Sequence, residues 1–295
     1  MISSLTDRKK SSVKLDRIVI QEHDPLEGLR HKYISTNPKT IKQQTENFYH
    51  KAFGRRKANF DKLDASWKDQ YRPINPINME WYKDLLAEPS EEEITKAIRD
   101  LPNNKASGPS DINYEMLKKL GERGKKILTK FYYICLKVGT TPTSWKKSNL
   151  YPIPKKDDWN GDLINTRPIV LLETTRKLFT KIITSRLSFI CKEKKILKGP
   201  NFAGLPGKST AEPIQLINNI CEDARENNKE LWILFQDTAK AFDTVNLEML
   251  SKAMKRIKIP DKAIRLIIDL FKDRELRVIL NNGLSDPITA GDGLD

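Results

Sequence analysis

The chain has 295 residues, of which 53 are Lys or Arg and 39 are Asp or Glu, so its formal net charge is +14. This length allows a sizeable core in one large domain or two smaller ones, and the positive charge favours nucleic acid as the partner. An anionic membrane surface is the competing partner, but the sequence has no run of 18 apolar residues and no signal-peptide pattern, so we expect no membrane association. Three widely spaced cysteines argue against a disulfide framework and a zinc site, and they indicate an intracellular protein with free thiols.

The N-terminal part, residues 1–78, is interpreted as a basic extension or linker. Within it, Phe48, Tyr49 and Phe53 indicate a helix that docks on another surface. Pro73 and Pro76, with asparagines close by, form a cluster of residues that break regular structure. We place a domain boundary there.

Besides a helix that contains Met116, Leu117 and Leu120, three helices are indicated between this boundary and residue 193. Ser90 and Glu93 form a capping box before the first helix. The second helix, residues 124–138, has on its apolar side Ile127, Leu128, Phe131, Ile134, Cys135 and Val138. The third helix, residues 174–192, is expected to turn Leu178, Ile182, Leu187 and Ile190 inward, and Arg176, Lys177, Lys181 and Arg186 outward.

Between the second and third helices, residues 148–156 and 165–172 indicate two strands joined by a polar turn. Lys155 and Arg167 stand near the loop that joins them. Two basic side chains at such a place suit phosphate, because Arg makes bidentate contacts and Lys supplies a point charge. By residue type alone, each is more often an ordinary surface charge.

Residues 231–235 are all apolar, which predicts a strand buried on both faces. Asp237 follows directly, and a carboxylate beside a buried strand needs a partner, so we expect it to face a cleft or a cation. This is the position of a metal ligand. The alternative is that Asp237 only caps a turn. Asp243 is expected past the strand end, solvated or capping, and Asn246 is predicted to begin a helix.

These segments resemble reverse transcriptases, especially those of non-LTR (LINE-type) retrotransposons. Phe-Gln-Asp-Thr-Ala-Lys-Ala-Phe-Asp-Thr-Val, residues 235–245, resembles the first palm motif, and Ile-Pro-Lys with Arg-Pro-Ile resembles the fingers hairpin. Gly-Pro-Ser-Asp, residues 108–111, and Gly-Lys-Ser-Thr, residues 207–210, resemble segments that open the fingers and precede the palm. The resemblance covers residues 79–295, with the motifs in the family's order.

The resemblance implies an α+β fold, mostly helical with short antiparallel hairpins: the fingers of a right-hand polymerase at residues 79–230 and the first part of the palm at 231–295. It implies synthesis of DNA on an RNA template from a DNA primer and deoxynucleoside triphosphates, with two Mg²⁺ ions as cofactors. Matched residue by residue, Asp237 is the catalytic metal ligand and Thr238 adds its backbone carbonyl. Lys155 and Arg167 fall on the positions that contact the triphosphate, and Phe242 falls under the sugar.

The family's Tyr-x-Asp-Asp-like motif, which supplies the other metal-binding carboxylates, has no counterpart in residues 1–295. We therefore expect this chain not to polymerise by itself. Two other hypotheses stay open: a non-catalytic nucleic-acid-binding protein derived from a polymerase, and a decayed fragment with no stable fold. The sequence leaves the oligomeric state and the compartment, nucleus or cytoplasm, undetermined.

Overall fold

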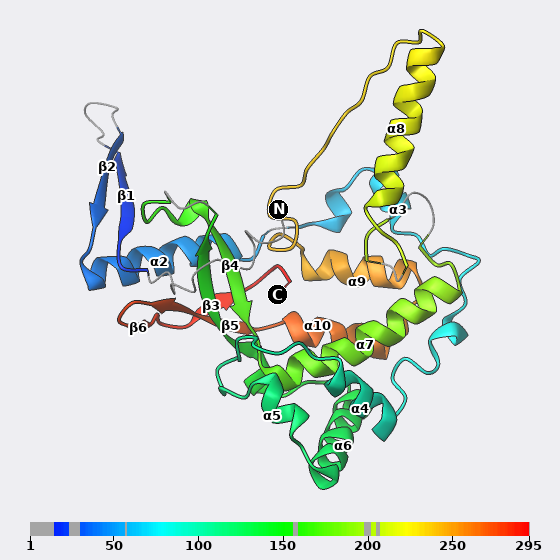
Figure 1. Ribbon diagram of the computed structural model, residues 1–295, viewed down its shortest axis with the longest axis horizontal. Coiled ribbons are helices and arrows are strands. Elements are labelled where there is room, and N and C mark those ends of the chain that lie inside the picture. Colours follow the sequence, from blue (N-terminus) through cyan, green and yellow to red (C-terminus); the bar gives the residue numbers. More distant parts are fainter. Residues whose placement is uncertain are drawn as a thin grey trace.

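The computed structural model describes residues 15–23, 30–56, 58–155, 159–197, 202–204 and 207–294. The fold is α+β, with a mixed sheet beside a group of helices (Figure 1). In the sheet, β3 (Lys147–Pro154) pairs antiparallel with β4 (Thr166–Leu171) and parallel with β5 (Arg274–Leu280). The short strands β6 (Gly283–Leu284) and β7 (Ile288–Ala290) both pair antiparallel with β5. The predicted hairpins are confirmed, and the parallel β3–β5 pair joins them into one sheet.

A hairpin and a long helix from the N-terminal part pack on this sheet. The hairpin is β1 (Ile18–His23) with β2 (Arg30–Ser35), and the helix is α2 (Pro38–Phe53), capped by the Asn37 side chain. Tyr49 and Phe53 are buried against β5 and β7, so the predicted docking helix is confirmed. The domain boundary near residue 78 stays a prediction, but residues 15–53 share a hydrophobic core with the sheet.

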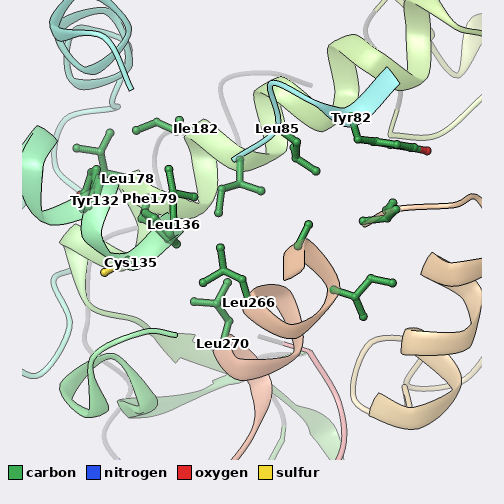
Figure 2. Packing of buried hydrophobic residues seen from close by; sticks show 14 of the residues in the cluster. Tyr82, Leu85, Tyr132, Cys135, Leu136, Leu178, Phe179, Ile182, Leu266 and Leu270 are labelled. Atoms are coloured by element: carbon green, nitrogen blue, oxygen red, sulfur yellow. The ribbon is translucent and has the colours of Figure 1, made fainter. Parts of the chain in front are cut away.

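The larger core lies among the helices. Figure 2 shows Leu178, Phe179 and Ile182 packing together with Tyr132, Leu136, Leu266 and Leu270. The helices that contribute are α4 (Glu91–Arg99), α6 (Glu122–Val138), α7 (Thr174–Glu193), α9 (Leu247–Arg256) and α10 (Asp261–Phe271). The shorter helices are α3 (Ala65–Gln70) and α5 (Tyr114–Lys118), with single turns at Phe60–Lys62, Met79–Tyr82, Thr143–Lys146 and Leu163–Asn165. Tyr82, Leu117 and Trp145 from these elements are buried in the helical core, and Leu163 is buried in the core at the sheet.

The capping box predicted at the start of α4 is confirmed for Ser90 but not for Glu93. Ser90 Oγ accepts a hydrogen bond from the Glu93 backbone N at 3.0 Å. The Glu93 carboxylate does not complete the box: it receives two hydrogen bonds from the Arg186 guanidinium, at 2.8 and 2.6 Å. A bidentate pair with a guanidinium is stronger than a bond to a backbone N–H, so the carboxylate links α4 to α7 instead.

Arg176 corrects the expected outward face of α7. Its side chain is among the most buried in the molecule, with 1% of the residue exposed. The guanidinium donates to the carbonyl oxygens of Trp145 and Leu270, both at 3.0 Å, and lies over the Phe271 ring. Carbonyl partners at the ends of two neighbouring elements make burial of this charge tolerable.

The apolar face predicted for α6 is rotated. Leu128, Thr129, Tyr132, Cys135 and Leu136 are buried, whereas Ile127, Phe131, Ile134 and Val138 are exposed. The difference comes from Tyr132, whose ring packs against Trp145 and Phe179 while its hydroxyl donates to the Thr175 carbonyl at 2.7 Å. An aromatic residue with a satisfied hydroxyl makes a larger buried contact than the aliphatic Ile127, Ile134 and Val138 on the other face.

The loop before α5 makes a close backbone contact with the start of α7. A Cβ on Gly108 would lie 2.6 Å from the carbonyl of Leu172 and from Glu173 N, so a side chain there requires the backbone to move. The buried Glu173 carboxylate accepts hydrogen bonds from Ser110 N at 2.8 Å and from Ser110 Oγ. These contacts explain why glycine occupies the turn.

The predicted buried strand at residues 231–235 is wrong. These residues are extended but exposed, with Trp232 at 87%, and they follow α8 (Ala211–Glu226), a helix with no buried residue. Figure 1 shows α8 standing away from the body, with the extended segment running back beside it. A strand needs a neighbour for its N–H and C=O groups. β3 and β5 are already paired on both edges, and among the described residues this run pairs with no strand.

The three thiols are free, as expected: Cys135 and Cys191 are buried, and Cys221 is half-buried. No helix in the described part of the chain has the length and apolar character needed to cross a bilayer.

The rotated face of α6 generates a prediction about stability. Leu136 is 1% exposed and Ile134 is 53% exposed, although the sequence placed Ile134 inward. Leu136→Ala should lower the free energy of unfolding by about 2–5 kcal/mol, because it leaves a cavity in the core. Ile134→Ala should change it by less than about 0.5 kcal/mol.

Urea unfolding followed by circular dichroism measures both variants under the same conditions. Since the two residues lie on one helix and both changes remove aliphatic groups, helix propensity is nearly matched. Equal losses, or a larger loss for Ile134→Ala, would contradict this orientation of α6.

Candidate nucleotide-binding site

A cavity of about 420 Å³ lies between the β3–β4 hairpin, the helix α2 and the turn at residues 240–243. It is large enough for a small ligand of the size that protein pockets commonly hold. Three of the residues predicted to bind nucleotide line it, namely Lys155, Arg167 and Phe242. The structure thus brings together side chains that the sequence separates widely.

The hairpin supplies two cations to the cavity. Lys155 directly follows β3, where its backbone N donates to the Asn165 carbonyl at 2.8 Å, and its Nζ donates to the Ile164 carbonyl at 3.0 Å. Arg167 lies on β4 opposite Ile153 in the antiparallel register. Both side chains are exposed, so their charges are available to a ligand at the rim.

Buried residues of α2 and β4 form the apolar wall of the cavity. Tyr49 is stacked on Phe53 with ring centroids 5.9 Å apart and makes an edge contact with Phe48 at 5.0 Å. The Tyr49 hydroxyl and Thr166 Oγ1 are 3.4 Å apart, within hydrogen-bond distance. Burial raises the pKa of Tyr49 to about 12, so its hydroxyl is protonated at neutral pH.

Phe242 and Asp243 reach the cavity from a tight turn. The turn is closed by hydrogen bonds from Thr244 N to the Lys240 carbonyl at 3.1 Å and from Val245 N to the Phe242 carbonyl at 3.4 Å. Phe242 is 72% exposed, so a large part of its ring is open to a ligand. The predicted cap of the following helix is confirmed, since Asn246 accepts from the backbone N of Glu248 and of Met249.

Asp243 is a cavity residue that sequence reasoning missed. It was expected past a strand end in a solvated or capping role, but it is half-buried and lines the cavity. Burial raises its pKa, while the charges of Lys240, Arg56 and Arg274 act in the opposite direction. Its place directly after Phe242 was the available signal, because a turn that presents one side chain to a cavity also brings its neighbour close.

Asp237 and Thr238 do not line the cavity. Both lie on the exposed extended segment that precedes the turn, and their roles as metal ligands remain predictions. Among the described residues, no three His, Cys, Asp or Glu side chains are grouped so that they could hold a metal ion. Magnesium sites in proteins commonly combine one or two carboxylates with substrate phosphates, so the role predicted for Asp237 does not require such a group.

A larger groove, of about 630 Å³, runs along α7, and it contains none of the predicted residues. Its lining is basic and hydroxylic, with one exposed ring: Lys177, Thr180, Lys181, Thr184, Ser185, Ser188, Phe189, Lys192 and Glu193. The ammonium groups of Lys177 and Lys181 donate to carbonyl oxygens of neighbouring loops and helices. This groove is a second basic surface, distinct from the cavity.

Known proteins resemble this chain over most of its length. The chain is 25% identical to the "Transposon TX1 uncharacterized 149 kDa protein" of Xenopus laevis over 99% of its residues and 21% of that protein. It is 28% identical to the "Probable RNA-directed DNA polymerase from transposon BS" of Drosophila melanogaster over 73% of its residues and 22% of that protein. It is 27% identical to the "RNA-directed DNA polymerase from mobile element jockey" of Drosophila melanogaster over 68% of its residues and 22% of that protein.

The chain therefore spans about a fifth of the length of these curated relatives. Residues 153–288 match the family "Reverse transcriptase (RNA-dependent DNA polymerase)". The matched stretch includes Lys155, the strand β4, the Phe242 turn and the strand β5, whereas most of β3 precedes it. On these matches residues 153–288, a little under half of the chain, are a stretch of the reverse transcriptase family, and the chain as a whole is similar to proteins of non-LTR retrotransposons.

Proposed function

We propose that the cavity binds the sugar and triphosphate of an incoming deoxynucleoside triphosphate during RNA-templated DNA synthesis by the complete protein. The observation that carries the proposal is that Lys155, Arg167 and Phe242 line a single cavity. The two cations can bind the triphosphate of the nucleotide, and the exposed ring can lie against its sugar. The location of all three residues within the family match supports this use.

The phosphate end is assigned to the hairpin. The planar guanidinium of Arg167 suits two oxygens of one phosphate, whereas Lys155 supplies a compact charge. Lys155 already donates to the Ile164 carbonyl, which fixes its ammonium group near the loop while leaving further N–H donors for a ligand. A polyphosphate at this rim would thus meet donors that are already in place.

The sugar end is assigned to Phe242. A ring beneath the sugar leaves no room for a 2′-hydroxyl, so this residue would select deoxynucleotides over ribonucleotides. The backbone of the turn is fixed by its own hydrogen bonds, which gives the ring a defined position. Asp243, next to it, is the acidic group in the cavity lining and adds a hydrogen-bond acceptor close to the sugar.

The chemistry of bond formation is assigned to Asp237. We propose that its carboxylate and the Thr238 carbonyl are ligands of a divalent ion, Mg²⁺ by family resemblance, and that two such ions act with an RNA template and a DNA primer. When bound, the ions would stabilise the attacking and leaving oxygens of nucleotidyl transfer. The described residues supply too few donors for this site, so residues 1–295 alone should bind nucleotide without extending a primer.

A second candidate function is nucleic-acid binding without catalysis. It is favoured by the groove along α7, where three lysines and the exposed Phe189 ring lie together. Lysines contact phosphates, and exposed aromatic rings stack on unpaired bases. The chain's net charge of +14 supports an interaction of this kind.

The first prediction concerns triphosphate binding by residues 1–295, measured by isothermal titration calorimetry with a deoxynucleoside triphosphate. Arg167→Ala and Lys155→Ala should each weaken binding by about tenfold, because each removes a charge-assisted contact. Lys147→Ala is the matched control, since Lys147 is an exposed lysine at the other end of β3. The affinity of the corresponding nucleoside, which lacks phosphates, should not change.

The second prediction concerns nucleic acid. The logarithm of the affinity for a primer–template duplex should fall linearly with the logarithm of the salt concentration, by about 0.9 per phosphate contacted. Lys192→Gln in the α7 groove should reduce this slope by about one, whereas Lys126→Gln on the exposed face of α6 should not. Fluorescence anisotropy measures both, and affinity that is constant from about 50 to 200 mM salt would refute nucleic-acid binding of this kind.

The third prediction concerns catalysis, measured by primer extension on a homopolymer RNA template. Residues 1–295 should give no extension, and a longer chain that continues through an Asp-Asp motif should extend the primer. Asp237→Ala should abolish that activity, because it removes the carboxylate nearest the proposed ion. Asp286→Ala changes an exposed aspartate at a distance from the cavity and should leave activity intact. Robust synthesis by residues 1–295, free of contaminating polymerase, would overturn the assignment.

A further inference from the structure

The N-terminal part of the chain contributes directly to the nucleotide cavity. Phe48, Tyr49, Ala52 and Phe53 of α2 line it, although α2 lies outside the stretch that matches the family, residues 153–288. α2 is seated on β5 and β7 through Ile41, Tyr49 and Phe53, all buried. The helix is therefore fixed to the same sheet that carries the two cations.

Arg56, just after α2, reaches the turn that presents Phe242. Its guanidinium donates to the Ala52 carbonyl at 3.0 Å, in the last turn of α2, and to the Asp243 carbonyl at 3.1 Å. Its backbone N donates to the Asp292 carboxylate at 2.5 Å. The side chain thus joins α2 to the backbone of the residue that follows Phe242.

The segment 291–294 holds the same turn from its other side. Leu294 N donates to the Phe242 carbonyl at 2.9 Å, and Gly293 N donates to the Val245 carbonyl at 2.8 Å. Gly293 has φ +88°, and a Cβ there would lie 2.8 Å from the Asp243 carbonyl oxygen, so this approach requires glycine. The buried Asp292 also accepts from Asn246 Nδ2 at 3.2 Å.

We infer that Arg56 is a positioning residue for the nucleotide cavity: it fixes the turn at residues 242–246 against α2 and thereby sets where the Phe242 ring meets the sugar. This inference rests on the proposed nucleotide site. Arg56 is not in the cavity lining, so it acts through the turn rather than on the ligand. Its planar fork spans two carbonyl groups on different segments, a geometry that a lysine does not reproduce.

The position of a ring under a sugar is sensitive to small movements of its backbone. Loss of the Arg56 side chain should therefore reduce discrimination between deoxy- and ribonucleotides more than it reduces phosphate binding. Lys155 and Arg167 lie on the hairpin, whereas Arg56 makes its hydrogen bonds to Ala52, Asp243 and Asp292. Sugar selectivity and triphosphate affinity thus report on different parts of the cavity.

The experiment compares Arg56→Ala and Arg56→Lys with Arg55→Ala in residues 1–295. Arg55 is the adjacent, exposed arginine, so its replacement removes the same charge without removing these contacts. Amide hydrogen exchange in the ligand-free protein should be several-fold faster at residues 242–246 and 291–294 in Arg56→Ala, less so in Arg56→Lys, and unchanged in Arg55→Ala. Thermal melting by circular dichroism establishes whether each variant is folded. If Arg56→Ala does not fold, the comparison of Arg56→Lys with Arg55→Ala tests the positioning role.

Calorimetry with a deoxynucleoside triphosphate and its ribonucleotide counterpart supplies the second readout. In Arg56→Ala the ratio of the two affinities should fall by about threefold to tenfold, the size of one weakened contact. If Arg56 variants match Arg55→Ala in both exchange and ratio, the positioning role is wrong. If the unchanged protein binds no nucleotide, the proposed function fails, whereas the exchange data still decide whether Arg56 fixes the turn.

Discussion

The buried carboxylate of Asp292 is the group on which the candidate site most depends. Only 1% of the residue is exposed, and its two oxygens accept from Arg56 N and Asn246 Nδ2. The backbone carbonyl of the same residue accepts from the buried guanidinium of Arg274 at 2.8 Å. A carboxylate without such partners would be very costly to bury, so these four segments must meet at one place for the chain to fold.

The cavity follows from this meeting point. Once Asp292 is satisfied, the end of α2 lies on one side and the turn at residues 242–246 on the other, and the space between them opens toward the hairpin. The hairpin consists of β3 and β4, and the parallel pairing of β3 with β5 fixes it to the rest of the sheet. β5 begins at Arg274, so the strand that positions the cations also positions the partner of Asp292.

Local signals in the sequence predicted much of this architecture. The helix boundaries and the β3–β4 hairpin follow from caps, periodicity and breakers, which act within a few residues: Ser90 and Asn246 cap the helices that the sequence indicated. The gathering of Lys155, Arg167 and Phe242 in one cavity was implied by the family resemblance rather than by periodicity.

Contacts between distant segments were not predictable in this way. The spacing of apolar residues predicts that α6 is amphipathic, but it does not decide whether Ile134 or Tyr132 is buried. That depends on Trp145 and Phe179, which contact α6 only in the folded chain. Arg56 and Arg176 look like surface charges because their carbonyl partners carry no side-chain signal in the sequence. The error at residues 231–235 has the same origin, since an apolar run specifies a buried strand only where a neighbouring strand exists.

The exposed position of residues 231–237 separates two parts of the proposed reaction. The side chains assigned to phosphate and sugar are fixed by the sheet, by α2 and by the segment 291–294, all of which are packed. Asp237, assigned to the metal, lies on a segment that pairs with no strand among the described residues, with Trp232 and Phe235 largely exposed beside it. Exposed apolar side chains of this size favour a covered position, so a partner that covered this segment would also set where Asp237 stands relative to the cavity. The proposed nucleotide binding and the proposed metal binding would thus depend on different contacts, and a change that weakens one need not weaken the other.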